Sequence, residues 1–133
     1  MILVDSSVWI DYFRGTITPQ TNRLDTLLTQ DILAIGNLIL AEVLQGFSHQ
    51  ADFNQAQQLF APLVTLNLVG VDVAVQSAQN FRFLSSKGIT VRKTIDTLIA
   101  TYCLVNHLSL LYSDRDFDPF VTHLGLQSAL HPL

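Results

Sequence analysis

The sequence predicts an α/β fold in which helices lie on both faces of a mostly parallel sheet of four to five strands. Short apolar runs that suit buried strands alternate along the chain with longer segments of helical period. Strands joined by helical crossovers are parallel, and such sheets carry helices on both faces. The length of 133 residues fits a single domain, residues 1–133, because one core usually spans about 100 to 200 residues.

The order of elements follows from the apolar runs and the turn residues between them. Strands are expected at residues 2–4, 32–35, 63–66 and 108–112, and helices at 7–14, 19–29, 37–46, 51–60, 71–86, 94–107 and briefly from 118. Asn37, Thr94 and Asp118 are the expected helix caps, the last of them before Pro119. The period of helix 71–86 comes from Val71, Val75, Ala78, Phe81 and Leu84.

The composition indicates a protein with a partner. Charged residues are 14% of the chain and hydrophobic residues 49%, whereas an ordinary soluble domain has about 25% charged residues. We therefore expect a second copy, giving a homodimer, or another tight protein partner to cover apolar surface. The net charge of −4 argues against broad binding to nucleic acid. The net charge does not exclude a nuclease, because bound metal ions would offset the charge of the acids that hold them. Four basic residues that could contact phosphates also lie in one stretch of the sequence: Arg82, Lys87, Arg92 and Lys93.

Several features indicate a cytoplasmic protein. The lone Cys103 has no disulfide partner, and the N-terminus shows no basic leader of a signal peptide. The longest apolar region, 32–44, is interrupted by Gly36, Asn37 and Glu42 and is shorter than the ~20 residues that a membrane span requires. We expect no contact with a membrane.

Ligands of parallel sheets bind at the carboxyl ends of the strands, and Asp5 follows the first strand directly. Its structural alternative is a helix cap, because Asp-Ser-Ser before an amphipathic run starts a helix well. Ser6 or Ser7 could serve as the cap equally well, which would leave Asp5 free to bind an ion.

Glu42 is the only glutamate of the chain, and it stands in a helix that is apolar on nearly all sides. Such a helix is mostly buried, and no basic residue lies three or four positions away. A buried, unpaired carboxylate costs several kcal/mol, which a bound metal would offset. The alternative is that Glu42 reaches an exposed strip of its helix.

Two further acids lie at places that favour a site, although each has a structural explanation. Asp96 lies in the first turn of the helix that starts at Thr94, where the helix dipole favours a negative charge. Asp114 closely follows the last strand, with Asp116 and Asp118 behind it. We place Asp114 in the site, and Asp116 is the alternative to it.

Four carboxylates at the strand ends would repel each other by ~3 kcal/mol per pair at about 5 Å. A bound cation would remove this repulsion. Oxygen ligands select hard ions such as Mg²⁺ or Mn²⁺, and the histidines are scattered surface or helix-end residues: His49, His107, His123 and His131. The acids therefore predict a metal site of Asp5, Glu42, Asp96 and Asp114.

Four segments of the sequence contain the candidate acids: VDSSVWIDYFRG at 4–15, AEVLQG at 41–46, RKTID at 92–96 and YSDRDF at 112–117. Together they resemble PIN-domain ribonucleases, specifically the VapC-type toxins of toxin-antitoxin pairs. The resemblance implies a three-layer α/β/α PIN-like domain, a metal-dependent endoribonuclease and a cognate antitoxin whose peptide covers the site. It carries over the same four acids, with Ser6 at the small hydroxyl position beside the first, and favours Asp114 over Asp116.

The expected reaction is hydrolysis of RNA, with transfer RNA as the substrate by analogy, by water activated by Mg²⁺ or Mn²⁺. Asp5 and Asp96 would ligate one ion, and Glu42 and Asp114 would complete the cage or hold a second ion. Ser6 and Thr94 would orient carboxylates, and Arg14, Arg92 or Lys93 would hold phosphates unless they are plain surface charges. Two alternatives stay open: a metal-assisted phosphatase with Asp5 as nucleophile, and a non-catalytic module that binds a partner protein.

Overall fold

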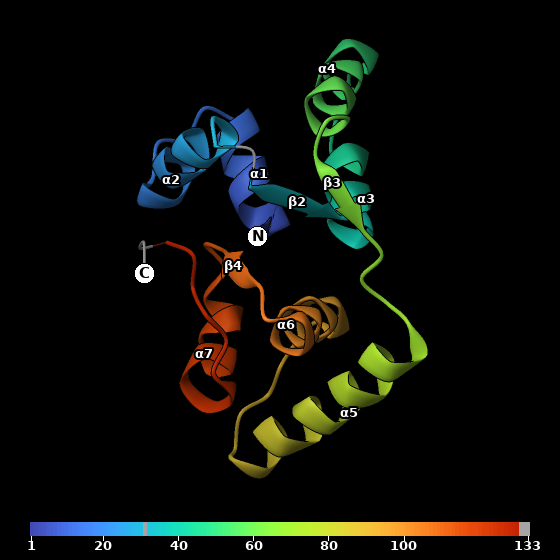
Figure 1. Cartoon of the computed structure of the whole chain (residues 1–133), viewed down its shortest axis with the longest axis vertical. Coiled ribbons are helices and arrows are strands. Elements are labelled where there is room, and N and C mark those ends of the chain that lie inside the picture. The colour runs from blue at the N-terminus through green and yellow to red at the C-terminus, as the bar shows by residue number, and fades with distance from the viewer. Residues whose placement is uncertain (31, 131–133) are drawn as a thin grey trace.

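The computed structural model describes residues 1–30 and 32–130, and its elements follow the predicted order (Figure 1). They are β1 (Ile2–Val4), α1 (Ser6–Phe13), α2 (Pro19–Leu28), β2 (Leu33–Gly36), α3 (Asn37–Gln45), α4 (Gln50–Phe60), β3 (Val64–Leu66), α5 (Val71–Ser86), α6 (Thr94–Asn106), β4 (Ser109–Leu111), a 3-10 turn η1 (Arg115–Phe117) and α7 (Asp118–Leu124). The strands and α-helices agree with the sequence prediction to within one residue at each predicted boundary. The turn η1 was not predicted.

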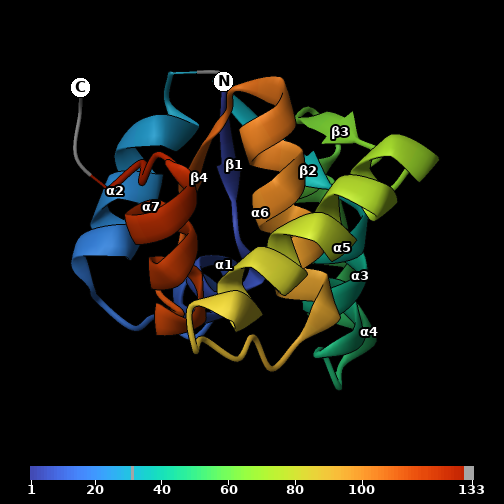
Figure 2. The same cartoon turned by 90° about the horizontal axis from the view of Figure 1, so that it is seen from below.

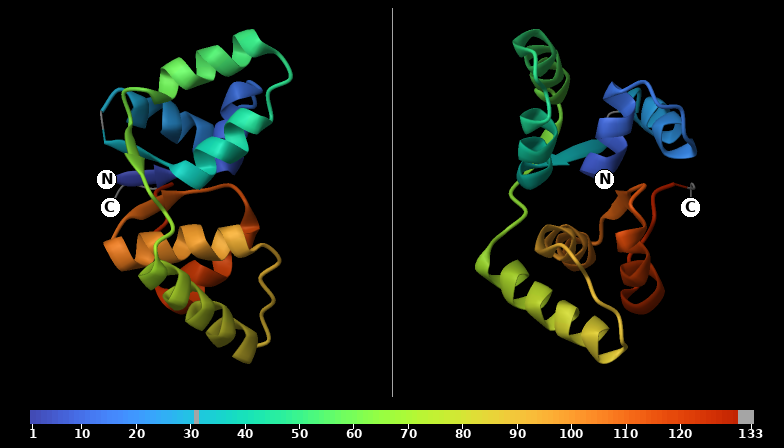
Figure 3. Two further views of the ribbon diagram at one scale, coloured as in Figure 1. Left: turned by 90° about the vertical axis from the view of Figure 1, so that its right-hand side faces the viewer. Right: turned by 180° about the vertical axis from the view of Figure 1, so that it is seen from behind.

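The four strands form an all-parallel sheet in the order β3-β2-β1-β4. Helices α1 to α4 lie on one face, and α5, α6 and α7 lie on the other (Figures 2 and 3). The α/β prediction with helices on both faces of a parallel sheet is therefore confirmed. Because β1 is central and pairs with β4, the carboxyl ends of these two strands lie side by side.

The core fixes this arrangement through buried apolar side chains from both faces. Leu3 and Leu110 are adjacent across β1 and β4, and neither is accessible to solvent. Trp9 of α1 is also fully buried, and its ring meets Phe60 of α4 edge-on at 4.9 Å between centroids. Such aromatic packing adds about 0.5 to 1.5 kcal/mol beyond area burial. This contact holds α1, whose first turn borders the site, against α4 in the same helix layer.

Helix α5 has the predicted bounds, but the residues that it buries are Val73, Ser77, Asn80 and Leu84, so Leu84 alone of the five predicted apolar residues is buried. Val71, Val75 and Phe81 are exposed, whereas Asn80 is buried. The reason is a polar contact with α6: the Asn80 amide donates a hydrogen bond to the Thr101 hydroxyl at 3.0 Å. A satisfied polar pair can be buried at little cost, so this side of α5 packs inward while Val71 and Val75 face solvent.

The three predicted caps are wrong by one position. Asn37, Thr94 and Asp118 are each the first residue of their helix, and no side-chain cap bond forms at Gly36, Lys93 or Phe117, which precede them. Asn37 instead accepts hydrogen bonds from the Leu38 and Leu68 backbone amides. Asp118 accepts from the Tyr112 hydroxyl at 2.8 Å.

Within residues 1–30 and 32–130, no helix is both long enough and apolar enough to cross a membrane. The apolar region at 32–44 is divided between strand β2 and helix α3. Cys103 is buried in the core, as its apolar surroundings in the sequence suggest.

Candidate active site

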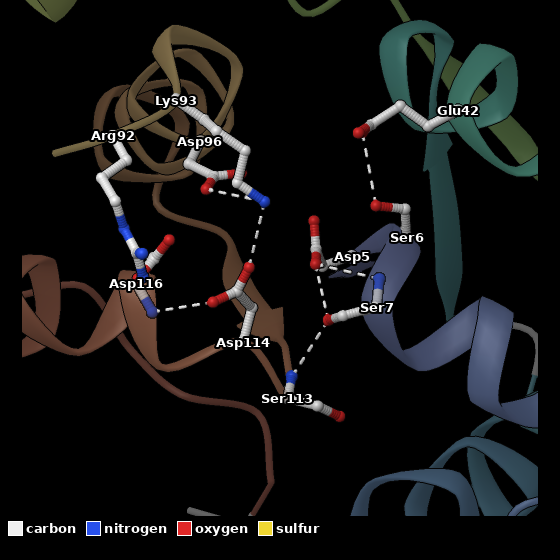
Figure 4. Close-up of polar contacts among 10 residues, drawn as sticks. All are labelled: Asp5, Ser6, Ser7, Glu42, Arg92, Lys93, Asp96, Ser113, Asp114 and Asp116. Carbon is white, nitrogen blue, oxygen red and sulfur yellow. Dashed lines mark hydrogen bonds and ion pairs between the residues drawn. The ribbon is translucent and has the colours of Figure 1, made fainter.

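The site forms where β1 and β4 end and where α1 and α6 begin (Figure 4). The backbone N–H of Asp5 donates to the Leu111 carbonyl at 2.9 Å, which ties the ends of the two strands together. Asp5 comes from the end of β1, Asp114 from the loop after β4, and Asp96 from the first turn of α6. Glu42 projects from α3 on the same side as Asp5, across from Asp96 and Asp114. The carboxyl ends of the parallel strands β1 and β4 therefore bring Asp5 and Asp114 to the same edge of the sheet.

Asp5 is 3% exposed and is itself the cap of α1, so neither Ser6 nor Ser7 replaces it in that role. Its Oδ2 accepts hydrogen bonds from the Ser7 backbone N–H at 3.1 Å and from the Ser7 hydroxyl at 2.6 Å. Burial raises the pKa of Asp5, and the bonds from Ser7 offset part of that rise. Both bonds from Ser7 reach the same oxygen, Oδ2.

Ser7 is the site residue that the sequence interpretation missed. Besides donating to Asp5, its hydroxyl accepts a hydrogen bond from the Ser113 backbone N–H at 3.2 Å. It therefore fixes the Asp5 carboxylate against the chain that follows β4. The signal was present in the sequence, because an aspartate cap commonly bonds to a residue two or three positions later.

Glu42 is less enclosed than predicted. Only Ile39 and Val43 of α3 are buried, Ala41 is exposed, and Glu42 itself is half-buried. Its Oε1 accepts a hydrogen bond from the Ser6 hydroxyl at 3.3 Å, as expected of a hydroxyl beside the first acid. Burial, and next the charge of Asp5, raise the pKa of Glu42. Because α3 packs through one side only, solvent reaches Glu42, and this carboxylate depends less on a bound metal than the sequence suggests.

The sequence predicts Glu42 to be the buried, unpaired carboxylate that a metal would stabilise, but in the structure this acid is Asp96. It is 4% exposed, and within the described part of the chain its Oδ2 is buried without a hydrogen-bond partner. The nearest cation is the Lys93 ammonium at 3.6 Å. Burial raises the pKa of Asp96 to about 6 although Lys93 opposes the rise. A helix dipole does not explain a buried oxygen without a donor, so Asp96 is the carboxylate that most needs a bound cation.

Asp96, Asp114 and Asp116 form a compact cluster. Each offers a carboxylate oxygen within 4.8 Å of the other two, and Asp5 and Glu42 are not in this group. Asp114 caps η1, because its Oδ1 accepts from the Asp116 backbone N–H at 2.9 Å. Burial tends to raise the pKa of Asp114, but that backbone bond and Lys93 outweigh it and lower the pKa. Asp116, the predicted alternative to Asp114, lies beside it and does not replace it.

The predicted basic residues divide between two places. Lys93 donates to Asp114 Oδ2 at 3.2 Å, and Arg92 pairs with Asp116 Oδ1 at the same distance. Arg14 is exposed at the end of α1 and lines a separate cavity of about 580 Å³ between α1, α3 and α4. Arg92 and Lys93 therefore border the acids, and Arg14 does not.

The remaining predicted residues are Thr94 and the histidines. Thr94 is exposed, and in the described ranges its hydroxyl has no hydrogen bond to an acid. His49 precedes α4, His107 ends α6 and His123 lies in the last turn of α7, as the helix-end expectation requires. His131 falls outside the described residues.

The donor set suits a hard divalent cation. The cluster offers only carboxylate oxygens, one of them buried and without a donor, and Mg²⁺ or Mn²⁺ prefers such ligands. Like charges this close repel each other unless a cation neutralises them. The residues present therefore fit a metal site, centred on Asp96, Asp114 and Asp116.

Comparison with known proteins shows the family of the chain. Residues 2–120 match the PIN domain family. Over 134 aligned residues the chain is 31% identical to VapC ribonuclease Mb1587 of Mycobacterium bovis and to ribonuclease VapC11 of Mycobacterium tuberculosis, covering 97% of this chain and 98% of each relative. A solved structure of VapBC2 from Rickettsia felis, bound to a DNA fragment from its promoter, superposes with a TM-score of 0.72 at 18% identity, over 96% of this chain and 97% of that one. The chain belongs to the PIN domain family, among relatives that are VapC ribonucleases.

Proposed function

We propose that this chain is a VapC-type ribonuclease toxin that hydrolyses RNA phosphodiester bonds with Mg²⁺ or Mn²⁺. The observation that carries the proposal is the buried Oδ2 of Asp96, which has no hydrogen-bond partner among the described residues and lies beside the carboxylates of Asp114 and Asp116. Its VapC relatives are named ribonucleases and match nearly the whole chain. This combination favours a nuclease over a module that only binds another protein.

The ion would be held first by Asp96, Asp114 and Asp116, which already lie within reach of one cation. Asp5 and Glu42 face them from the other side of the site and would complete the cage or hold a second ion. Bound there, Mg²⁺ or Mn²⁺ supplies positive charge that polarises the phosphodiester and makes water more acidic. An all-oxygen set of this kind requires no histidine as a general base.

The chain's own residues supply orientation and charge. Ser7 holds the Asp5 carboxylate in one position, and Ser6 donates to Glu42. Asp96, whose pKa burial raises to about 6, must lose its proton before it can bind a cation. Arg92 is 78% exposed at its side chain, so its guanidinium can reach a phosphate at the rim of the site.

Two protein partners and one substrate class complete the proposal. A cognate antitoxin would cover the site, as the VapBC assembly of the structural neighbour suggests. A second copy would cover the exposed valines of α5, Val71 and Val75, giving a homodimer in the cytoplasm. Transfer RNA is the proposed substrate among cellular RNAs.

The test is to incubate purified protein with total RNA and Mg²⁺ or Mn²⁺ and to map the cut sites by sequencing RNA ends. The proposal expects discrete cuts that disappear with EDTA and in the Asp5→Asn protein. Asp25→Asn, a change on α2 outside the described acid cluster, should cleave like the wild type. Antitoxin binding without any cleavage at saturating metal would instead favour the non-catalytic module.

A further inference from the structure

One cation already lies between two of the clustered acids. The Lys93 ammonium is 3.2 Å from Asp114 Oδ2 and 3.6 Å from Asp96 Oδ2 (Figure 4). The longer of these distances exceeds hydrogen-bond range, so Asp96 Oδ2 has a nearby charge but no donor. Lys93 thus neutralises the pair incompletely.

The position of Lys93 allows its side chain to move. It is the residue before α6, in an extended conformation, and 53% of its side chain is exposed. Apart from the two carboxylates, its ammonium has no hydrogen bond or ion pair within the described residues. Arg92 differs, because among the described residues its ion pair is with Asp116 and not with Asp96 or Asp114.

We propose that Lys93 is a displaceable counter-ion, which neutralises Asp96 and Asp114 without metal and leaves when a divalent cation binds them. This inference rests on the metal site of the proposed function. A divalent ion binds carboxylate oxygens at about 2.1 Å and carries twice the charge of an ammonium, so it gains more from the same two oxygens. The repulsion between the two cations then drives the lysine outward.

Two consequences follow from this exchange. Lys93 stabilises the metal-free fold and at the same time competes with the metal, so metal affinity is lower than the carboxylates alone would give. After displacement the ammonium lies at the rim, within reach of a phosphate drawn to the bound ion. Lys93 therefore contacts Asp96 and Asp114 while metal is absent and releases them when metal binds.

The experiment is Mn²⁺ titration by calorimetry of the wild type, Lys93→Met, Lys93→Arg and Lys87→Met. Lys87 is the matched control, because it ends α5 and lies over the Phe83 ring, at 5.5 Å from the centroid, not over an acid. We expect Lys93→Met to bind Mn²⁺ about tenfold tighter than the wild type. Lys93→Arg, which keeps the charge, and Lys87→Met should both stay within about twofold of it.

Thermal unfolding supplies a second readout that requires no RNA. In EDTA the Lys93→Met protein should melt a few degrees below the wild type, and saturating Mn²⁺ should abolish the difference. Unchanged or weaker Mn²⁺ binding by Lys93→Met would overturn the inference, as would the absence of binding in both proteins. Neither readout uses RNA, so failure of RNA cleavage alone would count against the proposed function and leave the counter-ion role standing.

Discussion

The two sides of the site hold their carboxylates by different means. On the cation side, Asp96, Asp114 and Asp116 face Lys93 and Arg92. On the hydroxyl side, Asp5 and Glu42 receive hydrogen bonds from the neutral hydroxyls of Ser7 and Ser6. The pKa directions follow this division in part, because Lys93 helps to lower the pKa of Asp114, whereas burial raises those of Asp5 and Glu42.

The difference indicates a division of labour between the sides. A hydroxyl donor orients a carboxylate without competing for a metal, so the hydroxyl side is held in place both with and without the ion. An ammonium competes directly for the same oxygens, so the cation side exchanges one positive charge for another. Asp96 belongs to the cation side, but its charge is the least well neutralised there. A substitution of Asp96 should therefore distinguish most clearly between metal binding and orientation of the carboxylates.

The largest expected effect is that of Asp96→Asn, which should lower RNA cleavage by about a thousandfold or more, because it removes charge at the centre of the cluster. The matched control is Asp72→Asn. Asp72 occupies the first turn of α5 as Asp96 does that of α6, but it is exposed. Cleavage rates at saturating Mn²⁺ check this, with circular dichroism to show that both variants fold. Equal activity of the two variants would remove Asp96 from the site.

Asp116→Asn should weaken Mn²⁺ binding by about ten- to thirtyfold, because one of the three clustered carboxylates loses its charge. Asp118→Asn, two residues away, should leave the affinity unchanged, since Asp118 bonds to the Tyr112 hydroxyl and not to the cluster. Calorimetric titration of the two proteins makes the comparison. Similar affinities for both would place Asp116 outside the metal site.

On the hydroxyl side, Ser7→Ala should lower the cleavage rate about tenfold and cost about 1 to 2 kcal/mol of folding free energy. It removes the 2.6 Å bond to Asp5 and leaves the Ser113 N–H without its acceptor. Ser6→Ala removes only a 3.3 Å bond to the half-buried Glu42, so a smaller loss is expected. Steady-state rates and urea unfolding test the order. A larger effect at Ser6 would reverse the assignment of the two serines.

The smallest effect concerns stability against pH in EDTA. Burial raises the pKa of Asp96 from its ordinary value of 3.8 to about 6, so between these values the folded state binds more protons than the unfolded state. Stability should therefore fall as pH rises from about 4 to 6.5, by on the order of 2 kcal/mol from this residue. Asp5 and Glu42 act in the same direction and Asp114 in the opposite one. Urea unfolding across this range should show a shallower slope for Asp96→Asn, and an unchanged slope would contradict the raised pKa.

The order and bounds of the strands and helices could be predicted because their signals are local. Apolar runs, Pro19 at the start of α2 and Gly15 after α1 all act within a few residues. The side of α5 that packs inward could not, because it depends on a bond between Asn80 and Thr101, in the neighbouring helix. Sequence periodicity cannot show which partner a polar residue will find.

The candidate acids could also be predicted, but their relative importance could not. The burial of Asp96 depends on how neighbouring elements cover the start of α6, and the openness of α3 decides how much Glu42 needs a cation. The turn η1 brings the Asp116 carboxylate next to that of Asp114, and this turn could not be predicted because its sequence has no apolar periodicity. Strand ends located the site, whereas only packing could rank its members.

The most direct test of the metal site is an anomalous difference map from crystals grown with Mn²⁺. The account predicts a peak within about 2.2 Å of carboxylate oxygens of Asp96 and at least one of Asp114 and Asp116, with the Lys93 ammonium moved away from both oxygens that it now contacts. A fully occupied peak elsewhere, or no peak at a Mn²⁺ concentration that supports RNA cleavage, would contradict it.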